Sequence, residues 1–201
     1  MTDRLALFLS EWIKLSFVFT PFFALSMFLS MTEGYSESRR RRLALAVSGA
    51  VAVLCLVLFF AGNQLFSLFG ITLNSFRIGA GALLFLSAVG MVQGNTATFG
   101  ATRDGNIAVV PLAMPIIVGP ATTGILLVLG AELDSVTAKG LGSLAVLLAV
   151  AGLCVILLLS SFIQRLLGNR GIVILSKLTG LILAALAAQM IMTGVQGFLT
   201  K

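Results

Sequence analysis

The stretch PLAMPIIVGPATTG, residues 111–124, places three prolines in one apolar segment of the chain. A proline has no amide hydrogen to donate and its ring clashes with the preceding turn, so a helix through this stretch must kink or unwind. The surrounding segment, about residues 107–131, is long and apolar enough to cross a bilayer. We therefore expect a membrane-spanning helix that is broken near its middle.

The rest of the chain also has the composition of a protein embedded in a bilayer. Of its 201 residues, 59% are hydrophobic and only 10% are charged, which is far from the usual composition of soluble domains. A spanning helix needs about 20 apolar residues. The sequence predicts an all-α membrane protein, a single membrane domain with six transmembrane helices at about 8–30, 43–62, 71–92, 107–131, 141–163 and 172–198.

The formal net charge is +6, and the basic residues gather between the apolar segments. The arginine run 39–42 follows the first segment, Arg103 follows the third, and Arg165 and Arg170 follow the fifth, whereas the loop 63–70 carries no charge. Cytoplasmic loops of membrane proteins retain an excess of Lys and Arg. We therefore predict a multi-pass protein with both termini on the periplasmic or extracellular side, and no nucleic-acid partner.

The residues that the chain lacks exclude several kinds of chemistry. It has no histidine, and its two cysteines, Cys55 and Cys154, each lie within an apolar run. Zinc sites and histidine-dependent nucleophilic catalysis are therefore not expected, and we predict no enzyme, no metal and no cofactor. No acidic residue is expected near the middle of a span, which favours a neutral or zwitterionic substrate over a cation.

Part of the sequence is repeated. The segment FRIGAGALLFLSAVGMVQG, residues 76–94, aligns without gaps on SKLTGLILAALAAQMIMTG, residues 176–194. Arg77 then meets Lys177, at an offset of 100 residues. Internal repeats of this kind change the interpretation of the whole fold.

The first and fourth spans also correspond, through Pro21 and Pro111. The two repeats are then residues 1–95 and about 107–201, with three spans each. Because an odd number of spans reverses direction, the second repeat must lie upside down relative to the first. Inverted repeats are common in transporters, with the substrate site near the middle of the membrane where they meet.

Broken helices in matching positions indicate such a central site. Unwound backbone at membrane depth is tolerated only where it is buried in protein or faces a polar cavity. Helix N-termini offer amides to an anionic group and freed carbonyls accept a cation, so a zwitterion fits both. The candidate substrate-binding residues are Thr20, Pro21, Ser26, Pro111, Pro115, Gly119, Pro120, Thr122, Thr123 and Gln189. The alternative is that the prolines only kink a packed helix and the hydroxyls bond back to their own carbonyls.

Three charged residues are candidates for gating or coupling. Glu33 is an acid at the end of the first span, and Arg77 and Lys177 begin equivalent helices, where the helix dipole disfavours cations. Arg77 and Lys177 either extend to the two membrane interfaces or close the two mouths of a pathway.

These segments resemble the MarC family of bacterial inner-membrane proteins, also called the SnatA or neutral amino acid transporter family. The resemblance covers the whole chain and is most specific in PLAMPIIVGPATTG, FRIGAGALLF and LTGLILAALAAQMIMTG. It implies six spans, a location in the inner membrane and, for some members, transport of glycine, alanine and serine. The chain departs from the family pattern at Thr20-Pro21, where Asn-Pro is usual, and at Ser26, where a second proline is usual.

The resulting hypothesis is a carrier of small neutral amino acids that works by alternating access, one inverted half rocking against the other. Its partners would be the small-molecule substrate and membrane lipids, and a homo-oligomer is left open. Two alternatives remain: a non-transporting membrane protein that binds lipid or a protein partner, and an efflux carrier for amphipathic drugs.

Overall fold

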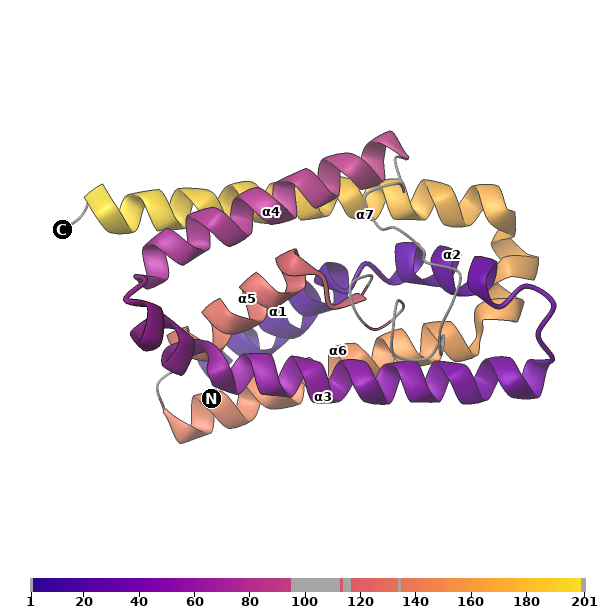
Figure 1. Ribbon diagram of the computed structural model, residues 1–201, viewed down its shortest axis with the longest axis horizontal. Helices are drawn as coiled ribbons and strands as arrows, with labels where there is room; N and C mark the ends of the chain where they lie inside the picture. Colours follow the sequence, from indigo (N-terminus) through magenta and orange to yellow (C-terminus); the bar gives the residue numbers. More distant parts are fainter. Residues whose placement is uncertain (1, 95–112, 114–116, 134, 200–201) are drawn as a thin grey trace.

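The computed structural model describes residues 2–94, 113, 117–133 and 135–199. Those residues form helices and connections without a strand (Figure 1). The helices are α1 (Thr2–Val18), α2 (Pro21–Met31), α3 (Glu37–Phe69), α4 (Leu73–Gln93), α5 (Pro120–Glu132), α6 (Val136–Leu158) and α7 (Ser160–Leu199).

Five stretches of the described chain are helical, long and apolar enough to cross a membrane. They are Phe8–Met31, which joins α1 and α2, then Glu37–Gly62, Leu73–Gln93, Val136–Leu158 and Ser160–Leu199. The remaining helix, α5, is apolar but has only 13 residues. This confirms an all-α protein with several apolar helices of membrane-spanning length.

Several predicted boundaries are wrong. The expected loop 63–70 is helical as far as Phe69, and α3 ends only where Gly70 adopts a left-handed conformation at φ 63°. The expected connection between 163 and 172 lies within α7, interrupted only at Gly168. Hydropathy detects apolar segments, whereas helix ends depend on caps such as Ser135, whose hydroxyl accepts from the Ala138 amide at 3.1 Å.

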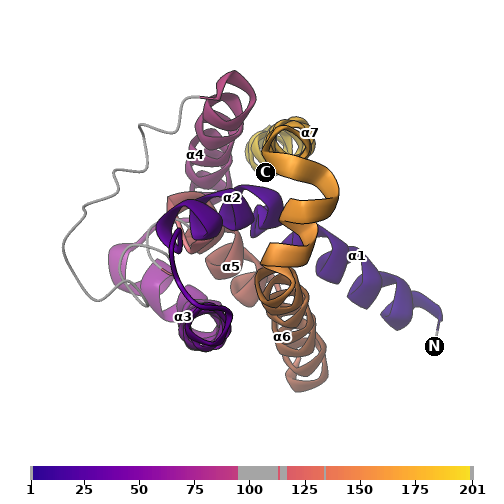
Figure 2. The same cartoon turned by 90° about the vertical axis from the view of Figure 1, so that its right-hand side faces the viewer.

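The helices form three layers. In Figure 1, α4 and α7 lie along one side, α3 and α6 along the other, and α1, α2 and α5 between them. Figure 2, turned by 90°, shows the same central position of α2 and α5. The two short helices α2 and α5 are therefore enclosed by longer ones.

The chain termini lie at the same end of the bundle as the α3–α4 and α5–α6 connections (Figure 1). The α2–α3 and α6–α7 connections lie at the opposite end. Arg39–Arg42 begin α3, and Arg165 and Arg170 lie near the start of α7, so these basic residues share that opposite end. Arg103 lies outside the described residues, and the side of the membrane that each end faces stays a prediction.

The outer pair α4 and α7 is antiparallel and packs through small residues. A side chain added at Gly81 would meet the Ala187 carbonyl at 3.1 Å, and one added at Gly180 would meet the Ala88 carbonyl at 3.1 Å. Such close backbone approach is typical of small residues between membrane helices.

The two ends of this pair make related contacts. Gly194 faces Arg77, with 3.2 Å between an added Cβ and the arginine Cβ, and Gly94 faces Lys177, with 3.9 Å to the lysine Cε. In the alignment of residues 76–94 with residues 176–194, Arg77 corresponds to Lys177 and Gly94 to Gly194. The contact of Arg77 with Gly194 therefore corresponds to the contact of Lys177 with Gly94.

Candidate functional site

The first spanning segment is broken at Thr20. This residue lies between α1 and α2 with φ 47° and ψ 55°, and among the described residues it alone has a positive φ without being glycine. A left-handed conformation costs a β-branched residue about 1–2 kcal/mol. The break therefore carries local strain, and α2 begins at Pro21 without a side-chain cap.

A second break precedes α5. Gly119 is extended, with φ −83° and ψ −179°, and α5 begins at Pro120, again without a side-chain cap. Just before it, the Val118 amide donates to the Ala113 carbonyl five residues back, at 2.9 Å, which is wider than an α-helical turn. The described chain is thus interrupted beside Gly119-Pro120, while Pro111 and Pro115 lie outside the described residues.

The two breaks face one cavity of about 30 Å³, named here the Thr20 cavity. Its walls come from both broken segments and from α4 and α7: Val18, Thr20, Phe23, Leu84, Ser87, Met91, Ile117, Gly119, Ala121, Thr122 and Leu183. Because a water molecule needs about 10–15 Å³ of such space, this cavity of about 30 Å³ has room for water but not for an amino acid. In this conformation the centre is closed.

Two hydroxyls at this cavity donate to backbone carbonyls. Thr122 Oγ1 donates to the Ile117 carbonyl at 3.0 Å, across the break, and Ser87 Oγ donates to the Leu83 carbonyl at 2.9 Å. Both hydroxyls thus bond to carbonyls of their own segments, and a role of Thr122 in substrate binding stays a prediction. Each oxygen keeps acceptor capacity for a ligand.

A larger cavity of about 360 Å³ lies beside the α2–α3 turn and is named the Arg40 cavity. It is mostly polar, with walls formed by Ser26, Leu29, Ser30, Glu33, Gly34, Arg40, Gln164, Asn169, Ile172 and Val173. Arg40 Nη1 donates to Ser161 Oγ at 2.6 Å, and Nη2 donates to the Thr32 carbonyl at 3.1 Å. Ser26, expected beside the central break, lies here instead.

A third cavity of about 160 Å³ lies at the other end of the bundle and is named the Arg77 cavity. Its walls are Glu11, Lys14, Leu15, Val18, Arg77, Ile125, Val128, Leu129, Glu132, Leu186, Gln189, Met190 and Thr193. Gln189 was predicted at the centre and lies here.

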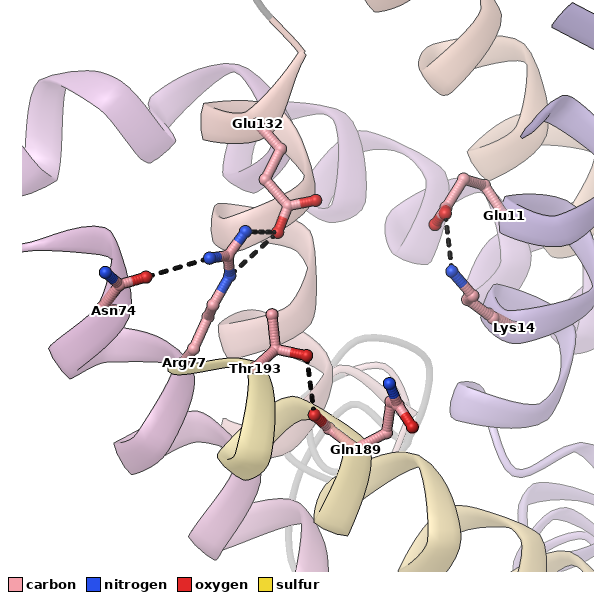
Figure 3. Close-up of polar contacts among 7 residues, drawn as sticks. All are labelled: Glu11, Lys14, Asn74, Arg77, Glu132, Gln189 and Thr193. Carbon is pink, nitrogen blue, oxygen red and sulfur yellow. Dashed lines mark hydrogen bonds and ion pairs between the residues drawn. The ribbon is translucent and has the colours of Figure 1, made fainter. Parts of the chain in front are cut away.

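The charges of this cavity are paired, as Figure 3 shows. Arg77 donates through Nη2 and Nε to Glu132 Oε1, at 2.5 and 3.1 Å, and through Nη1 to Asn74 Oδ1 at 3.0 Å. Lys14 Nζ contacts Glu11 Oε1 at 2.8 Å. Each cation therefore has its own carboxylate.

The remaining predicted residues take no direct part in these cavities. Lys177 is exposed and lies at none of them. It resembles Arg77 in its contact with a glycine, but only Arg77 lines one of these three cavities. Thr123 is half-buried, and its amide donates to the Gly119 carbonyl at 2.9 Å. Pro21 is half-buried and begins α2.

The three cavities follow one another along the broken first segment. Residues 11–18 contribute to the Arg77 cavity, 18–23 to the Thr20 cavity and 26–34 to the Arg40 cavity. Along α7 the same order runs backward, from Thr193 through Leu183 to Asn169. The cavities therefore form a row from one end of the bundle to the other.

Residues 5–199 match the family model described as MarC family integral membrane protein. The chain belongs to the MarC family. It is 32% identical to a UPF0056 membrane protein of Aquifex aeolicus, covering 96% of this chain and 94% of the relative. It is 34% identical to one of Methanocaldococcus jannaschii, covering 90% and 92%. No solved structure matches this MarC protein.

A further MarC relative is named an inner membrane protein, YhgN of Escherichia coli, at 33% identity over 94% of this chain and 95% of the relative. The match and the apolar helices together make this chain an integral membrane protein. The names of these relatives give no substrate.

Sequence reasoning missed three polar residues of these cavities. Ser87 is the only hydroxyl residue in the apolar segment 76–94, a signal that was available. Arg40 was read only as part of a basic run, yet it lies on the same helical face as the buried residues Ala44, Val47 and Val51. Glu132 could be connected with Arg77, 55 positions away, only in three dimensions.

Proposed function

We propose that this MarC protein carries small neutral amino acids, such as glycine, alanine or serine, across the membrane by alternating access. The observation that supports this most is the row of three cavities whose middle member lies between two helix breaks. Unwound backbone of this kind occurs at membrane depth where it faces a cavity. The substrate site is then the Thr20 cavity, which must widen to admit its ligand.

The chemistry of this central site favours a small zwitterion. Its described wall residues include no charged side chain, and their polar groups are hydroxyls and the backbone at Thr20 and Gly119. A zwitterion needs no charged partner of its own there, because helix N-terminal amides and freed carbonyls provide opposite partial charges. A drug carrier would need a wide aromatic cavity, whereas the described walls of this small one include one aromatic side chain, Phe23.

We further propose that the six-span architecture is built from two inverted repeats, residues 1–95 and 107–201. Support comes from α4 and α7, which are antiparallel and exchange equivalent contacts. The helix starts at Pro21 and Pro120 are separated by 99 positions, the same separation as Cys55 and Cys154. These two helix starts make Pro120 a better structural counterpart of Pro21 than Pro111, which lies outside the described residues.

The experiment is counterflow into proteoliposomes loaded with unlabelled substrate. We expect uptake of radiolabelled glycine, alanine or serine, and none of lysine or glutamate. The double variant Gly119→Ala, Pro120→Ala restores helix-forming residues at the second break and should abolish this uptake. The matched control Gly152→Ala, at an exposed glycine with open space around it, should leave uptake unchanged.

Two results would contradict the proposal. Uptake that is unaffected by the double variant would remove the break from the mechanism. A purified, correctly inserted protein that moves none of the neutral amino acids, but is stabilised by lipids alone, would support the non-transporting alternative.

A further inference from the structure

The Arg40 cavity contains two opposite charges that do not neutralise each other. Glu33 and Arg40 both contribute to its walls, yet no ion pair joins them within 4.0 Å, and no carboxylate in the described residues pairs with Arg40. The guanidinium is held by two neutral oxygens, of Ser161 and Thr32, and its buried Nε has no partner among the residues that the structure describes.

The opposite end of the bundle makes the contrast clear. In the Arg77 cavity both cations contact a carboxylate, Lys14 at 2.8 Å and Arg77 at 2.5 Å. The charges of that cavity therefore satisfy one another without a ligand. The Arg40 cavity has more than twice the volume. Its positive pole, Arg40, and its negative pole, Glu33, make no ion pair with any described residue.

The positions of the two poles are fixed by the local fold. Arg40 lies at the start of α3, and its guanidinium reaches back 3.1 Å to the carbonyl of Thr32, the residue that precedes Glu33 in the chain. Gly34, with φ 78°, turns the chain between them. Glu33 and Arg40 therefore both line this cavity without an ion pair between them.

We propose that the Arg40 cavity is a second binding site for a small free zwitterion, an α-amino acid, at one mouth of the pathway. The ligand carboxylate accepts hydrogen bonds from the spare donors of Arg40, and its ammonium lies against Glu33. An α-amino acid carries both groups on one carbon, so it can bridge poles that are close but not in contact. The amides of Gln164 and Asn169 and the hydroxyls of Ser26 and Ser30 are further polar groups of the wall.

This assignment rests on the proposed transport function for its choice of ligand and adds a step to it. The Thr20 cavity is too small for an amino acid in the present conformation, whereas the Arg40 cavity is open. The zwitterion is held at this mouth before the centre opens, or after the centre has released it.

The test measures binding to the purified protein in detergent by isothermal titration calorimetry with three ligands. L-alanine has both charges, L-alaninamide lacks the carboxylate, and propionate lacks the ammonium. Arg40→Gln and Glu33→Gln each remove one pole. Arg41→Gln and Glu37→Gln are matched controls, because both residues are exposed and lie outside the cavity.

We expect Arg40→Gln and Glu33→Gln each to weaken alanine binding about tenfold or more, as charge-assisted hydrogen bonds do when removed. Arg40→Gln should leave the affinity for alaninamide unchanged, and Glu33→Gln should leave that for propionate unchanged. Arg40→Lys, which keeps the charge, should restore part of the alanine affinity. Both controls should bind like the unmodified protein.

Equal loss of alanine and alaninamide in Arg40→Gln would overturn the proposal, because the arginine would then not contact the carboxylate. Unchanged alanine binding in both variants would also overturn it. Counterflow separates the two proposals. Normal flux that depends on neither Arg40 nor Glu33 would support the transport proposal and reject the second site. Alanine binding that depends on both charges, without flux, would support the second site and reject the transport proposal.

A phosphatidylethanolamine headgroup carries the same pair of charges, so a lipid source needs its own measurement. The protein is placed in nanodiscs of phosphatidylglycerol with or without phosphatidylethanolamine. Thermal stabilisation by that lipid which disappears in Arg40→Gln and Glu33→Gln, together with no alanine binding, would overturn the assignment to a free amino acid. Alanine binding that is equal in both nanodiscs would support it.

Discussion

Thr122→Val tests whether the second helix break depends on one hydroxyl. Thr122 is 4% exposed, and its Oγ1 donates to the Ile117 carbonyl at 3.0 Å. Among the described residues no backbone amide serves that carbonyl. Valine has nearly the shape of threonine, so the substitution leaves a buried carbonyl unpaired without opening a cavity.

The matched control is Thr179→Val. Thr179 is 2% exposed and makes the same kind of bond, to the Leu175 carbonyl at 2.9 Å. That carbonyl lies inside α7, where the regular helix supplies it with a backbone amide four residues on. The hydrogen bond from the Thr179 hydroxyl is therefore a second one to that carbonyl, and its loss leaves no buried carbonyl without a partner.

An unsatisfied buried acceptor costs about 1–3 kcal/mol. At about 2–4 °C per kcal/mol for a chain of this size, Thr122→Val should lower the thermal midpoint by roughly 2–12 °C. Thr179→Val should cost less than about 1 kcal/mol. The assay is thermal unfolding of both variants in the same detergent, with alanine counterflow measured in parallel.

Counterflow should fall about tenfold or more in Thr122→Val, because each 1.36 kcal/mol lost from the rate-limiting step is about tenfold in rate. It should be unchanged in Thr179→Val. Equal thermal shifts in the two variants would refute the reasoning, since the Ile117 carbonyl would then have another partner. A destabilised Thr122→Val with full flux would separate the break from transport.

Three other predictions concern packing, backbone strain and the ion pair. Gly130→Ala would overlap a backbone carbonyl of α3 and should cost more than about 1 kcal/mol, whereas Gly152→Ala, with open space around it, should be neutral by thermal unfolding. Thr20→Gly should be more stable than Thr20→Ala by about 1 kcal/mol, because only glycine adopts positive φ freely. Within a regular helix alanine would be the more stable of the two. Equal stability of the two variants would contradict the left-handed conformation. Exchanging Arg77 and Glu132 should change the free energy of unfolding by less than about 1 kcal/mol, because the pair is partly exposed. The single change Glu132→Gln should increase access of a water-soluble label to the Arg77 cavity. Unchanged labelling would show that the ion pair does not act as a gate.

The helix breaks could be predicted from the sequence because proline acts locally. Pro120 removes a hydrogen bond wherever the chain places it, so a helix start there follows from the residue itself. The conformation of Thr20 did not follow, since a residue before proline usually adopts an extended conformation. Only the surrounding packing holds it at φ 47°.

The cavities could be predicted only in part. Placing Thr20, Gly119 and Thr122 together required the correspondence of two broken spans, which the prolines indicated. Ser26 lies further along α2 than the residues of the Thr20 cavity, and it faces the Arg40 cavity instead. The direction of a side chain around an all-apolar helix depends on its neighbours, and hydropathy does not contain that information.

The pairing of charges depends on tertiary structure as well. Arg77 and Lys177 occupy equivalent places in the repeat, yet within the described part of the chain only Arg77 pairs with a carboxylate. The glutamate comes from the far end of α5, and nothing in either local sequence identifies it. A repeat in the sequence therefore predicts a shared backbone arrangement more securely than a shared role.

The helices of the two proposed repeats are interwoven. The extensive contacts join α4 with α7 and α5, α3 with α5 and α6, α1 with α6, and α2 with α7. Each half therefore packs mainly on the other and little on itself. A hinge drawn between the sequence halves would pull apart the glycine contacts along α4 and α7. We therefore expect the moving body to contain helices from both halves, with the two discontinuous segments shifting as a unit inside a fixed outer frame.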